Sequence, residues 1–501
     1  MAPATYLGID LGTSEVKVLL MDAAQHIVAT AHAPLAASRP HEHWSEQDPA
    51  AWWDATRACI DAIAHAHPQA LAALHGIGLS GQMHGLTLLD ASGAVLRPAI
   101  LWNDTRASAE CAALERRVPQ LRAITGNLAM PGFAAPKLLW VAGHEPDLFA
   151  RTAMVLLPKD YLRYLLTGEY VSDLSDASGT LWLDVGRRDW SDRMLGACGL
   201  TRAQVPRLVE GSQPGGMLRP GLAQAWGIAG AVVVAGGAGD NAASAVGMGV
   251  VAPGTAFLSL GTSGVLFVAS AAYQPNPEEG VHTFCHALPG QWHQMGVMLS
   301  AASCLRWAAR VTGAADEAAL LADVERLDPA TLATAPLFLP YLSGERTPHN
   351  DPAASGVWFG LRHDTDRAQL AYAVLEGVAF GLLDCCLALQ AAGGTVDSAA
   401  LVGGGSRSGY WARLLASALG MPLTVNTGAH VGAALGAARL ALLAANPGLA
   451  VDQVCLAPAI EQRIAPDPAW RAALLPRHTR FRALYRQLQP LFHEEPHHAA
   501  D

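Results

Sequence analysis

Two copies of the string Leu-Gly-Thr-Ser, at residues 11–14 and 260–263, have the composition of turns that bind phosphate. Each copy lies between two apolar runs, so each predicts a hairpin of two β-strands joined by a tight turn. Glycine permits such a turn, and the N–H groups and hydroxyls then point outward together and can bind an anion. The two glycines are 261 − 12 = 249 positions apart, about half of the chain. We therefore expect two similar halves that hold a nucleotide between them; two ordinary β-turns are the alternative.

An aspartate precedes the first turn but not the second. Asp10 lies two residues before Gly12, and Ser259 stands at the matching position of the second copy. A carboxylate next to a bound phosphate is repelled unless a cation lies between them, so Asp10 is a candidate Mg²⁺ ligand, directly or through water. The alternative is a strand-end aspartate that caps the N–H groups of its own turn.

A second carboxylate, Asp240, follows an apolar run and a group of glycines and precedes a helix of small residues. The N-terminus of a helix stabilises negative charge and lowers the proton affinity of a carboxylate. The glycines allow a substrate to approach the backbone. We interpret Asp240 as a general base that accepts a hydroxyl proton during phosphoryl transfer; simple capping of the helix is the alternative.

Three further segments have compositions typical of loops or close packing. Residues 80–85, Ser-Gly-Gln-Met-His-Gly, predict a small binding loop at a strand end, although a single histidine in a loop is more often structural. Residues 403–406, Gly-Gly-Gly-Ser, lead into a helix and are a second candidate nucleotide loop. Residues 431–438 contain mainly glycine and alanine, which predicts close helix packing and no chemistry.

Strand and helix patterns alternate through the chain and predict α/β layers in both halves. A buried strand is expected over residues 227–237, and strands over 75–79 and 98–102. The boundary between the halves is expected near residues 247–254, where glycine and proline gather before the second hairpin. The helical patterns cover residues 49–63, 158–166, 300–309, 366–391, 408–419 and 431–445.

The composition narrows the class of protein. At 501 residues with 51% hydrophobic and 15% charged residues, the chain has enough apolar side chains for two domains. A formal net charge of −10 without a basic run argues against a nucleic-acid partner. Eight scattered cysteines without metal-ligand spacing indicate reduced thiols. No signal-peptide pattern is present, and the apolar stretch 370–392 contains Glu376 and Asp384, so we expect a cytoplasmic protein without a membrane partner.

These segments together resemble the FGGY carbohydrate kinases, and the resemblance extends over nearly the whole chain. It implies a two-domain α/β fold of the actin-like, ribonuclease H-like sugar-kinase type, with a catalytic cleft between the domains. Within the family the chain is most similar to the bacterial members that phosphorylate D-xylulose. The motifs that carry the resemblance are IDLGTS, SGQMHG, RPAILWND, ITGNLAMPGF, LLPKDYLRYLLTGE, SDLSDASGTLWLDV, GAGDNAASAVG, LSLGTSGV, FLPYLSGERTPHND and LVGGGSRS.

Carried over by position, the resemblance assigns roles to individual residues. It implies that residues 1–248 form an N-terminal domain with the sugar site and the base, and that residues 249–490 form a C-terminal domain that binds mainly ATP. Glu15 replaces the usual small residue, and Gly409 stands where the family often has an asparagine that faces the adenosine. The catalytic base falls on Asp240 and the Mg²⁺-associated aspartate on Asp10; sugar contacts fall on Met83, His84, Asp240 and Asn241, and nucleotide contacts on Thr13, Ser14, Gly261, Thr262, Gly405 and Ser406.

The implied reaction converts ATP and D-xylulose to ADP and D-xylulose 5-phosphate, a step of xylose catabolism. One alternative is a kinase of the same family for another ketose or a polyol, such as ribulose or a sugar alcohol. An alternative from another class is a non-kinase ATPase of the same fold, against which Asp240 and the 80–85 loop argue. The sequence leaves the oligomeric state open, with a homodimer among the alternatives.

Overall fold

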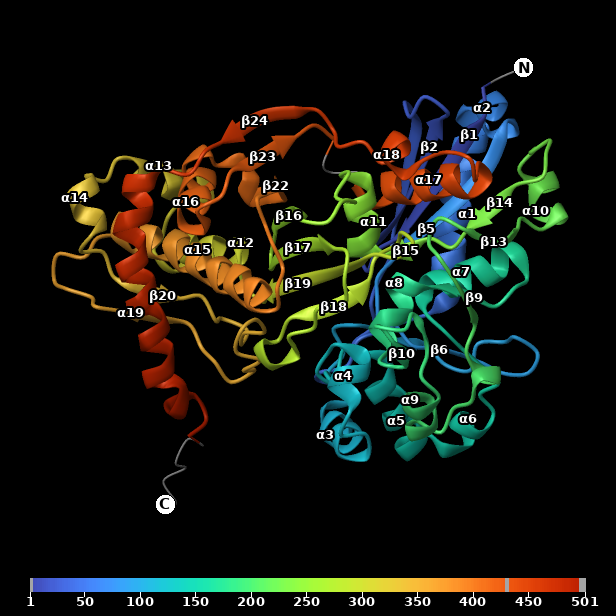
Figure 1. The fold of residues 1–501 in the computed structure, drawn as a ribbon, viewed down its shortest axis with the longest axis horizontal. Helices are drawn as coiled ribbons and strands as arrows, with labels where there is room; N and C mark the ends of the chain where they lie inside the picture. Colours follow the sequence, from blue (N-terminus) through green and yellow to red (C-terminus); the bar gives the residue numbers. More distant parts are fainter. Residues whose placement is uncertain (1–2, 429–431, 495–501) are drawn as a thin grey trace.

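The computed structural model describes residues 3–428 and 432–494, which form two lobes, each built around a mixed β-sheet (Figure 1). The strands of the first sheet are β1 (Thr5–Leu11), β2 (Glu15–Asp22), β3 (Ile27–Pro34), β5 (Leu74–Gly81), β13 (Pro214–Met217), β14 (Val233–Ala235) and β15 (Ala238–Gly239). Those of the second are β16 (Thr255–Leu260), β17 (Gly264–Ser270), β18 (His282–Cys285), β19 (Trp292–Met298), β22 (Ser398–Val402), β23 (Leu423–Asn426) and β24 (Ile460–Ile464).

The two sheets repeat one another in strand order and polarity. The first runs β3-β2-β1-β5-β14-β13 and the second β19-β17-β16-β22-β23-β24, with β15 and β18 as additions. In both, the hairpin strands pair antiparallel and the next two pairings are parallel. The α/β layers and the two similar halves predicted from the repeated string are therefore confirmed.

The two hairpin turns share the same four-residue string but differ in length. Leu11 pairs with Val16 across the first turn, whereas Leu260 pairs with Gly264 across the second. The extra residue is Glu15, whose carbonyl accepts a hydrogen bond of 3.0 Å from the N–H of Gly12. Its carboxylate lies 3.6 Å from the ammonium of Lys17 on the same strand, which offsets the negative charge it adds near the turn.

Helices form at the six places where the sequence patterns predicted them, and capping residues mark several of their ends. Asp48 accepts a bond from the N–H of Ala50 at the start of α1, and Gly168 ends α7 in the left-handed conformation. The helices of the first half are α1 (Pro49–Ala66), α2 (Pro68–Ala72), α3 (Ser108–Arg117), α4 (Leu121–Thr125), α5 (Ala134–His144), α6 (Pro146–Ala150), α7 (Pro158–Thr167), α8 (Leu174–Ala177), α9 (Asp192–Ala197), α10 (Pro220–Ala225) and α11 (Asp240–Gly247). Those of the second are α12 (Ala302–Val311), α13 (Glu317–Glu325), α14 (Pro329–Leu332), α15 (Arg367–Ala391), α16 (Gly409–Leu419), α17 (Gly432–Ala445), α18 (Val451–Val454) and α19 (Pro468–Phe492).

The strand predicted over residues 227–237 is much shorter than expected. Only Val233–Ala235 pairs as β14, because Gly227 adopts a positive φ and residues 228–232 form a loop whose middle, residues 229–231, is exposed. Short two-stranded pairs complete the lobes: β4 (Glu46–Gln47) with β7 (Ala99–Ile100), β6 (Thr87–Leu89) with β8 (Met154–Leu156), β9 (Val171–Asp173) with β12 (Arg207–Val209), β10 (Leu183–Asp184) with β11 (Asp189–Trp190), and β20 (Leu337–Leu339) with β21 (Val357–Phe359).

Helix α17 comes from the second half of the chain but packs on the first sheet and on α11 (Figure 1). The contact is backbone against backbone. A Cβ at Gly8 would lie 1.9 Å from the Ala434 carbonyl oxygen, and one at Gly78 would lie 1.8 Å from that of Ala437. The predicted close packing of residues 431–438 is confirmed for 432–438, while Val431 lies outside the described residues.

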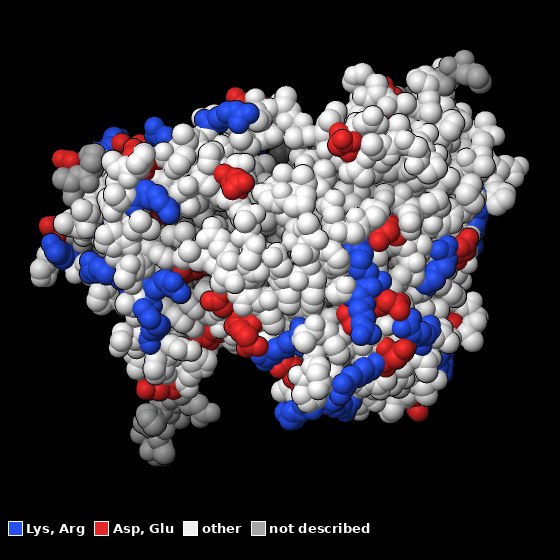
Figure 2. Space-filling model, viewed as in Figure 1, with Lys and Arg blue, Asp and Glu red and all other residues white. Residues whose placement is uncertain are grey.

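Helix α15 is long and apolar enough to cross a membrane, but 89% of its apolar window is buried inside the second lobe. It is a core helix, as its two carboxylates predicted. Over the face shown in Figure 2, lysines and arginines alternate with aspartates and glutamates, and a broad central zone contains neither.

Candidate active site

A cavity of about 280 Å³ lies between the two lobes and takes its lining from both. The first half of the chain contributes the 80–85 loop at the end of β5 and the start of α11. The second half contributes the second hairpin and the segment after β20. The lining residues are Met83, His84, Trp102, Met130, Gly132, Phe133, Asp240, Asn241, Ser263, Val265, His282, Met295, Val297 and Arg346.

Asp240 is the first residue of α11 and faces this cavity. Its Oδ1 accepts bonds from the Asn241 backbone N–H at 2.7 Å and side-chain amide at 3.0 Å. Burial and the charge of Asp10 raise the pKa of Asp240 to about 7. The predicted lowering by the helix N-terminus was therefore wrong in sign, because desolvation and a second carboxylate outweigh the backbone N–H groups. A pKa near neutrality suits a general base.

Asp10 lies near the end of β1, between its sheet neighbours Lys17 and Ser80. Its Oδ1 accepts a 2.9 Å bond from the Ser80 hydroxyl. Burial raises the pKa of Asp10, while Ser80 and the charge of Lys17 act against that rise. The Asp10 charge in turn raises the pKa of Asp240, so the two carboxylates repel one another, although only Asp240 lines the cavity.

His84 is held in one orientation and one protonation state. Its backbone is left-handed, with φ of 69°, and its Nδ1 lies 2.7 Å from the carbonyl oxygen of Gly179. Burial lowers the pKa of His84 to about 3, so the ring is neutral at physiological pH. A carbonyl can only accept, so Nδ1 carries the proton and Nε2 is a hydrogen-bond acceptor. The Lys137 ammonium donates to the His84 carbonyl at 2.9 Å and fixes the backbone of the loop.

Gln82 directly precedes Met83 and His84 at the end of β5. Its side chain binds the first hairpin turn and does not line the cavity. Its side-chain oxygen accepts a 3.0 Å bond from the Thr13 hydroxyl, and its amide donates to Gln47 at 2.9 Å. The indole N–H of Trp102 also donates to the Thr13 hydroxyl, at 3.0 Å. The Thr13 hydroxyl thus joins the first turn to the cavity wall.

A fully buried charge cluster lies behind Asp240. The Lys159 ammonium lies 2.6–3.1 Å from Asp160, Asp173 and Asp176. Burial and the neighbouring aspartates raise the pKa of Asp176 well above its usual range. Arg163 belongs to the same cluster, because its guanidinium lies 2.6 Å from Asp160.

This cluster reaches the backbone that carries Asp240. The Arg163 guanidinium donates to the carbonyls of Ala235 and Gly236, and the Gly239 N–H donates to the Ser175 hydroxyl at 3.1 Å. That hydroxyl donates in turn to Asp173. The cluster thus positions the glycine-rich segment immediately before the candidate base, and Lys159 and Arg163 come from the LLPKDYLRYLLTGE segment.

A second cavity, of about 630 Å³, lies wholly in the second half of the chain, between α12, α13 and the start of α16. Gly405 and Gly409 are among its lining residues, and a Cβ at Gly409 would meet nothing within 4 Å. The size and the glycine-rich wall suit a nucleoside. Ser406 is not among the lining residues; its hydroxyl donates to the Gly403 carbonyl at 2.7 Å.

The second hairpin turn lies between the two cavities. Ser263 lines the first cavity, and the carbonyls of Gly261 and Thr262 accept bonds from the N–H groups of Ala302 and Ala301 at the start of α12. Thr262 is exposed, as is Ser14 in the first turn. Among the described residues, the hydroxyls of Ser14 and Thr262 have no protein hydrogen-bond partner.

Comparison with known proteins shows which family the chain belongs to. The sequence profile of the FGGY family of carbohydrate kinases matches residues 5–247 for the N-terminal domain and residues 256–445 for the C-terminal domain. The chain belongs to this family. It is therefore a carbohydrate kinase, and family membership makes ATP a substrate.

Individual relatives extend this similarity over almost the whole chain. A xylulose kinase from Escherichia coli (strain K12) is 55% identical over 97% of this chain and 99% of its own length. A xylulose kinase from Klebsiella pneumoniae is 52% identical over the same two shares. A crystal structure described as a xyloylose kinase from Brucella ovis has a TM-score of 0.94 and 55% identity, and covers 97% of this chain and 100% of its own. The expectation of an FGGY sugar kinase is confirmed.

Several lining residues of this FGGY kinase were not predicted as functional. They are Trp102, Phe133, His282 and Arg346. Three of them stand in segments quoted for the resemblance, RPAILWND, ITGNLAMPGF and FLPYLSGERTPHND, and so a signal existed. His282 had none, because an isolated histidine in a strand has no distinctive spacing.

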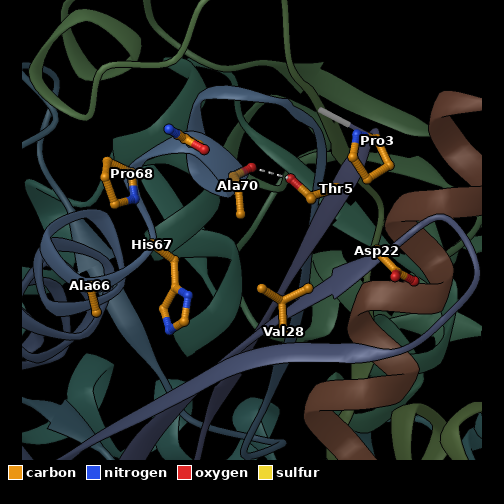
Figure 3. A pocket seen from close by; sticks show the side chains of 9 residues that line it. Pro3, Thr5, Asp22, Val28, Ala66, His67, Pro68 and Ala70 are labelled. Carbon is orange, nitrogen blue, oxygen red and sulfur yellow. Dashed lines mark hydrogen bonds between the residues drawn. The ribbon is translucent and has the colours of Figure 1, made fainter. Parts of the chain in front are cut away.

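Metal-ligand groups, cysteines and the surface groove of this FGGY kinase give less evidence of a functional site than the two cavities do. Among residues 3–428 and 432–494, no group of three or more His, Cys, Asp or Glu side chains could hold a metal ion by itself. The eight cysteines are free thiols, and all but Cys111 are buried. A surface groove of about 530 Å³ near the start of β1 is lined by Asp22 and His67, among others, and its Thr5 hydroxyl already donates to Ala70 (Figure 3).

Proposed function

We propose that this protein transfers the γ-phosphoryl group of ATP to the 5-hydroxyl of D-xylulose, a step of xylose catabolism that takes place in the cytoplasm. The observation that carries the proposal is the cavity of about 280 Å³ in which the Asp240 carboxylate and the neutral His84 ring line a space of the size of a pentulose. The 55% identity to a xylulose kinase over nearly the full length supports the same substrate.

Asp240 acts as the general base. The sugar oxygen forms a bond to the γ-phosphorus, the bond from that phosphorus to the β–γ bridging oxygen breaks, and ADP leaves with the electron pair. The hydroxyl proton passes to the Asp240 carboxylate. Asn241 holds the other carboxylate oxygen through two hydrogen bonds and so orients the base. Met83 and Phe133 supply apolar walls that keep water from competing with the sugar.

The nucleotide is expected to lie chiefly on the second domain, residues 249–490, and the sugar chiefly against the first, residues 1–248. The adenosine would occupy the cavity beside Gly405 and Gly409, with Ser406 supporting that loop. The phosphates would contact the two hairpin turns through Thr13, Ser14, Gly261 and Thr262. Closure of the two lobes would complete the site, and a homodimer is compatible with these sites.

Asp10 fits the role of a Mg²⁺ contact. One of its oxygens is bonded to Ser80, and the structure places no protein donor on the other among the described residues. A single carboxylate suffices because protein-bound Mg²⁺ usually takes most of its ligands from nucleotide phosphates and water. The ion, when bound, would supply charge stabilisation to the transferring phosphoryl group. It would also offset the repulsion between Asp10 and Asp240.

Replacement of Asp10 should show itself in the metal requirement. In Asp10→Ala we expect the Mg²⁺ concentration for half-maximal activity to rise and kcat to fall, with little change in D-xylulose affinity, because Asp10 is not among the residues that line the sugar cavity. Initial rates over a Mg²⁺ series, together with sugar binding by calorimetry, measure both. Unchanged Mg²⁺ dependence with a collapse of sugar affinity would contradict the metal assignment.

A sugar panel tests the proposed substrate. D-Xylulose should exceed glycerol by several orders of magnitude in kcat/KM, because glycerol leaves buried polar groups such as His84 without partners. His84→Ala should narrow this ratio, chiefly through lost activity on D-xylulose. Ribulose and pentitols belong in the panel. A higher kcat/KM for one of these would reassign the substrate, and ADP release without sugar stimulation would support an ATPase instead.

A further inference from the structure

Arg346 is an unassigned cation in the wall of the sugar cavity. Among the described residues, no carboxylate lies within ion-pair distance of its guanidinium, and its side-chain hydrogen-bond partner is the Nε2 of His282 at 3.1 Å. The neighbouring Glu345 carboxylate attracts Arg346 electrostatically but makes no ion pair with it, and its Oε1 accepts bonds from the backbone N–H groups of Leu299 and Arg346. Most arginines in enclosed surroundings pair with an acid, so this one has donors to spare for a ligand.

A relay of hydrogen bonds sets the direction of this guanidinium. His282 Nε2 faces Arg346, which can only donate, so Nδ1 carries the proton and donates to the Asn127 side-chain oxygen at 2.9 Å. The Asn127 amide donates to the carbonyls of Thr125 and Thr283, which fixes its orientation. The hydrogen bond to His282 therefore fixes the position of the Arg346 guanidinium in the cavity wall.

Arg346 and His84 lie at the same end of the cavity. The Phe133 ring contacts both the His84 ring, at 4.6 Å between centroids, and the His282 ring, at 5.6 Å. The Arg346 charge is among those that lower the pKa of His84, whereas the charge that raises the pKa of Asp240 is that of Asp10. The hydroxyl that is phosphorylated must meet Asp240, so the other end of the sugar meets Arg346 and His84.

We infer that Arg346 is a specificity residue that recognises the carbonyl oxygen of a ketose, beside a hydroxyl recognised by His84. The guanidinium can only donate, and the His84 Nε2 can only accept. An α-hydroxyketone offers the complement, a carbonyl that only accepts next to a hydroxyl that can donate. The C2 carbonyl and 1-hydroxyl of D-xylulose have this arrangement. The inference rests on the proposed function and extends it to the feature of the sugar that is recognised.

Three substrates separate the two interactions in the intact enzyme. Xylitol lacks the carbonyl, and 1-deoxy-D-xylulose lacks the 1-hydroxyl. In Arg346→Met we expect kcat/KM for D-xylulose to fall about 10- to 100-fold, mainly through KM, as for a lost hydrogen bond to a charged group. The preference for D-xylulose over xylitol should shrink by a similar factor, while the preference over 1-deoxy-D-xylulose should stay the same. His84→Ala should show the reverse pattern.

Controls distinguish recognition from general damage. Arg362→Met removes an exposed arginine of the same lobe and should leave all three substrates unchanged. Arg346→Lys keeps the charge but not the planar pair of donors and should lie between the parent and Arg346→Met; it also provides the test if Arg346→Met does not fold. An equal loss for all substrates, or an unchanged xylulose-to-xylitol ratio, would overturn the assignment.

Two outcomes with the parent enzyme complete the test. If D-xylulose is not phosphorylated at all, the proposed function fails, and the Arg346 assignment fails with it. If D-xylulose is phosphorylated but D-xylonate is as good a substrate or better, Arg346 recognises a carboxylate, and only the assignment to a ketone is wrong.

Discussion

Asp240→Asn is expected to lower kcat by about 10²–10⁴-fold, the usual effect of removing a general base. Asparagine keeps the shape and can still lie at the start of α11, but it cannot take the proton of the sugar hydroxyl. Folding, ATP binding and D-xylulose binding should remain close to those of the parent. Steady-state kinetics together with calorimetric binding of each substrate measure the two effects separately.

The pH dependence gives a second readout of the same residue. The pKa of Asp240 is raised to about 7, and the base is active only when deprotonated. The kcat/KM of the parent should therefore rise with pH through about 7 and level off above it. The residual activity of Asp240→Asn should lack that rise. A folded variant with near-normal turnover, or one that keeps the rise, would remove Asp240 from this role.

Lys159→Met is expected to lower the free energy of unfolding of the first lobe by about 3–5 kcal/mol, because it removes one partner from a fully buried ion cluster. Methionine fills most of the lysine volume, so the loss would come from carboxylates left without compensation and not from a cavity. Activity should fall as well, since the cluster holds the backbone before Asp240. Urea unfolding followed by lobe-specific hydrogen exchange measures the change.

Arg187→Met is the matched control for this variant. It removes the same single charge, but Arg187 is 87% exposed and lies 3.7 Å from its partner Asp184. A surface ion pair of this kind contributes at most about 1 kcal/mol. If the unfolding midpoint of Lys159→Met moved as little as that of Arg187→Met, the buried cluster would have no structural role.

The main features of the fold could be predicted from local signals. The repeated Leu-Gly-Thr-Ser strings located both hairpins, and the helical patterns over residues 49–63 and 408–419 located α1 and α16, which Asp48 and Ser408 cap in the structure. Such signals work because capping and tight turns depend on a few adjacent residues. The predicted strand over residues 227–237 failed for the converse reason: its composition was apolar, but pairing in a sheet depends on a neighbouring strand.

The candidate site was predictable only in part. Asp10, Met83, His84 and Asp240 stood out by type and context, and the structure places Met83, His84 and Asp240 around one cavity and Asp10 beside Asp240. Arg346 did not stand out, because an arginine in a polar segment is usually solvated and its lack of an acidic partner is visible only in three dimensions.

Sequence alone determined the duplicated α/β architecture, the positions of the two hairpin turns and membership of a sugar-kinase family, since each depends on short motifs and their order. Tertiary structure decided what depends on distant groups. It docked α17 from the second half on the first sheet, and it made Nε2 of His84 an acceptor through the Gly179 carbonyl. It also raised the pKa of Asp240 through burial and Asp10, where the helix terminus alone would have lowered it. The protonation state of a side chain and its role as a hydrogen-bond donor or acceptor depend on the residues that surround it in the folded protein, and those residues lie far apart in the sequence.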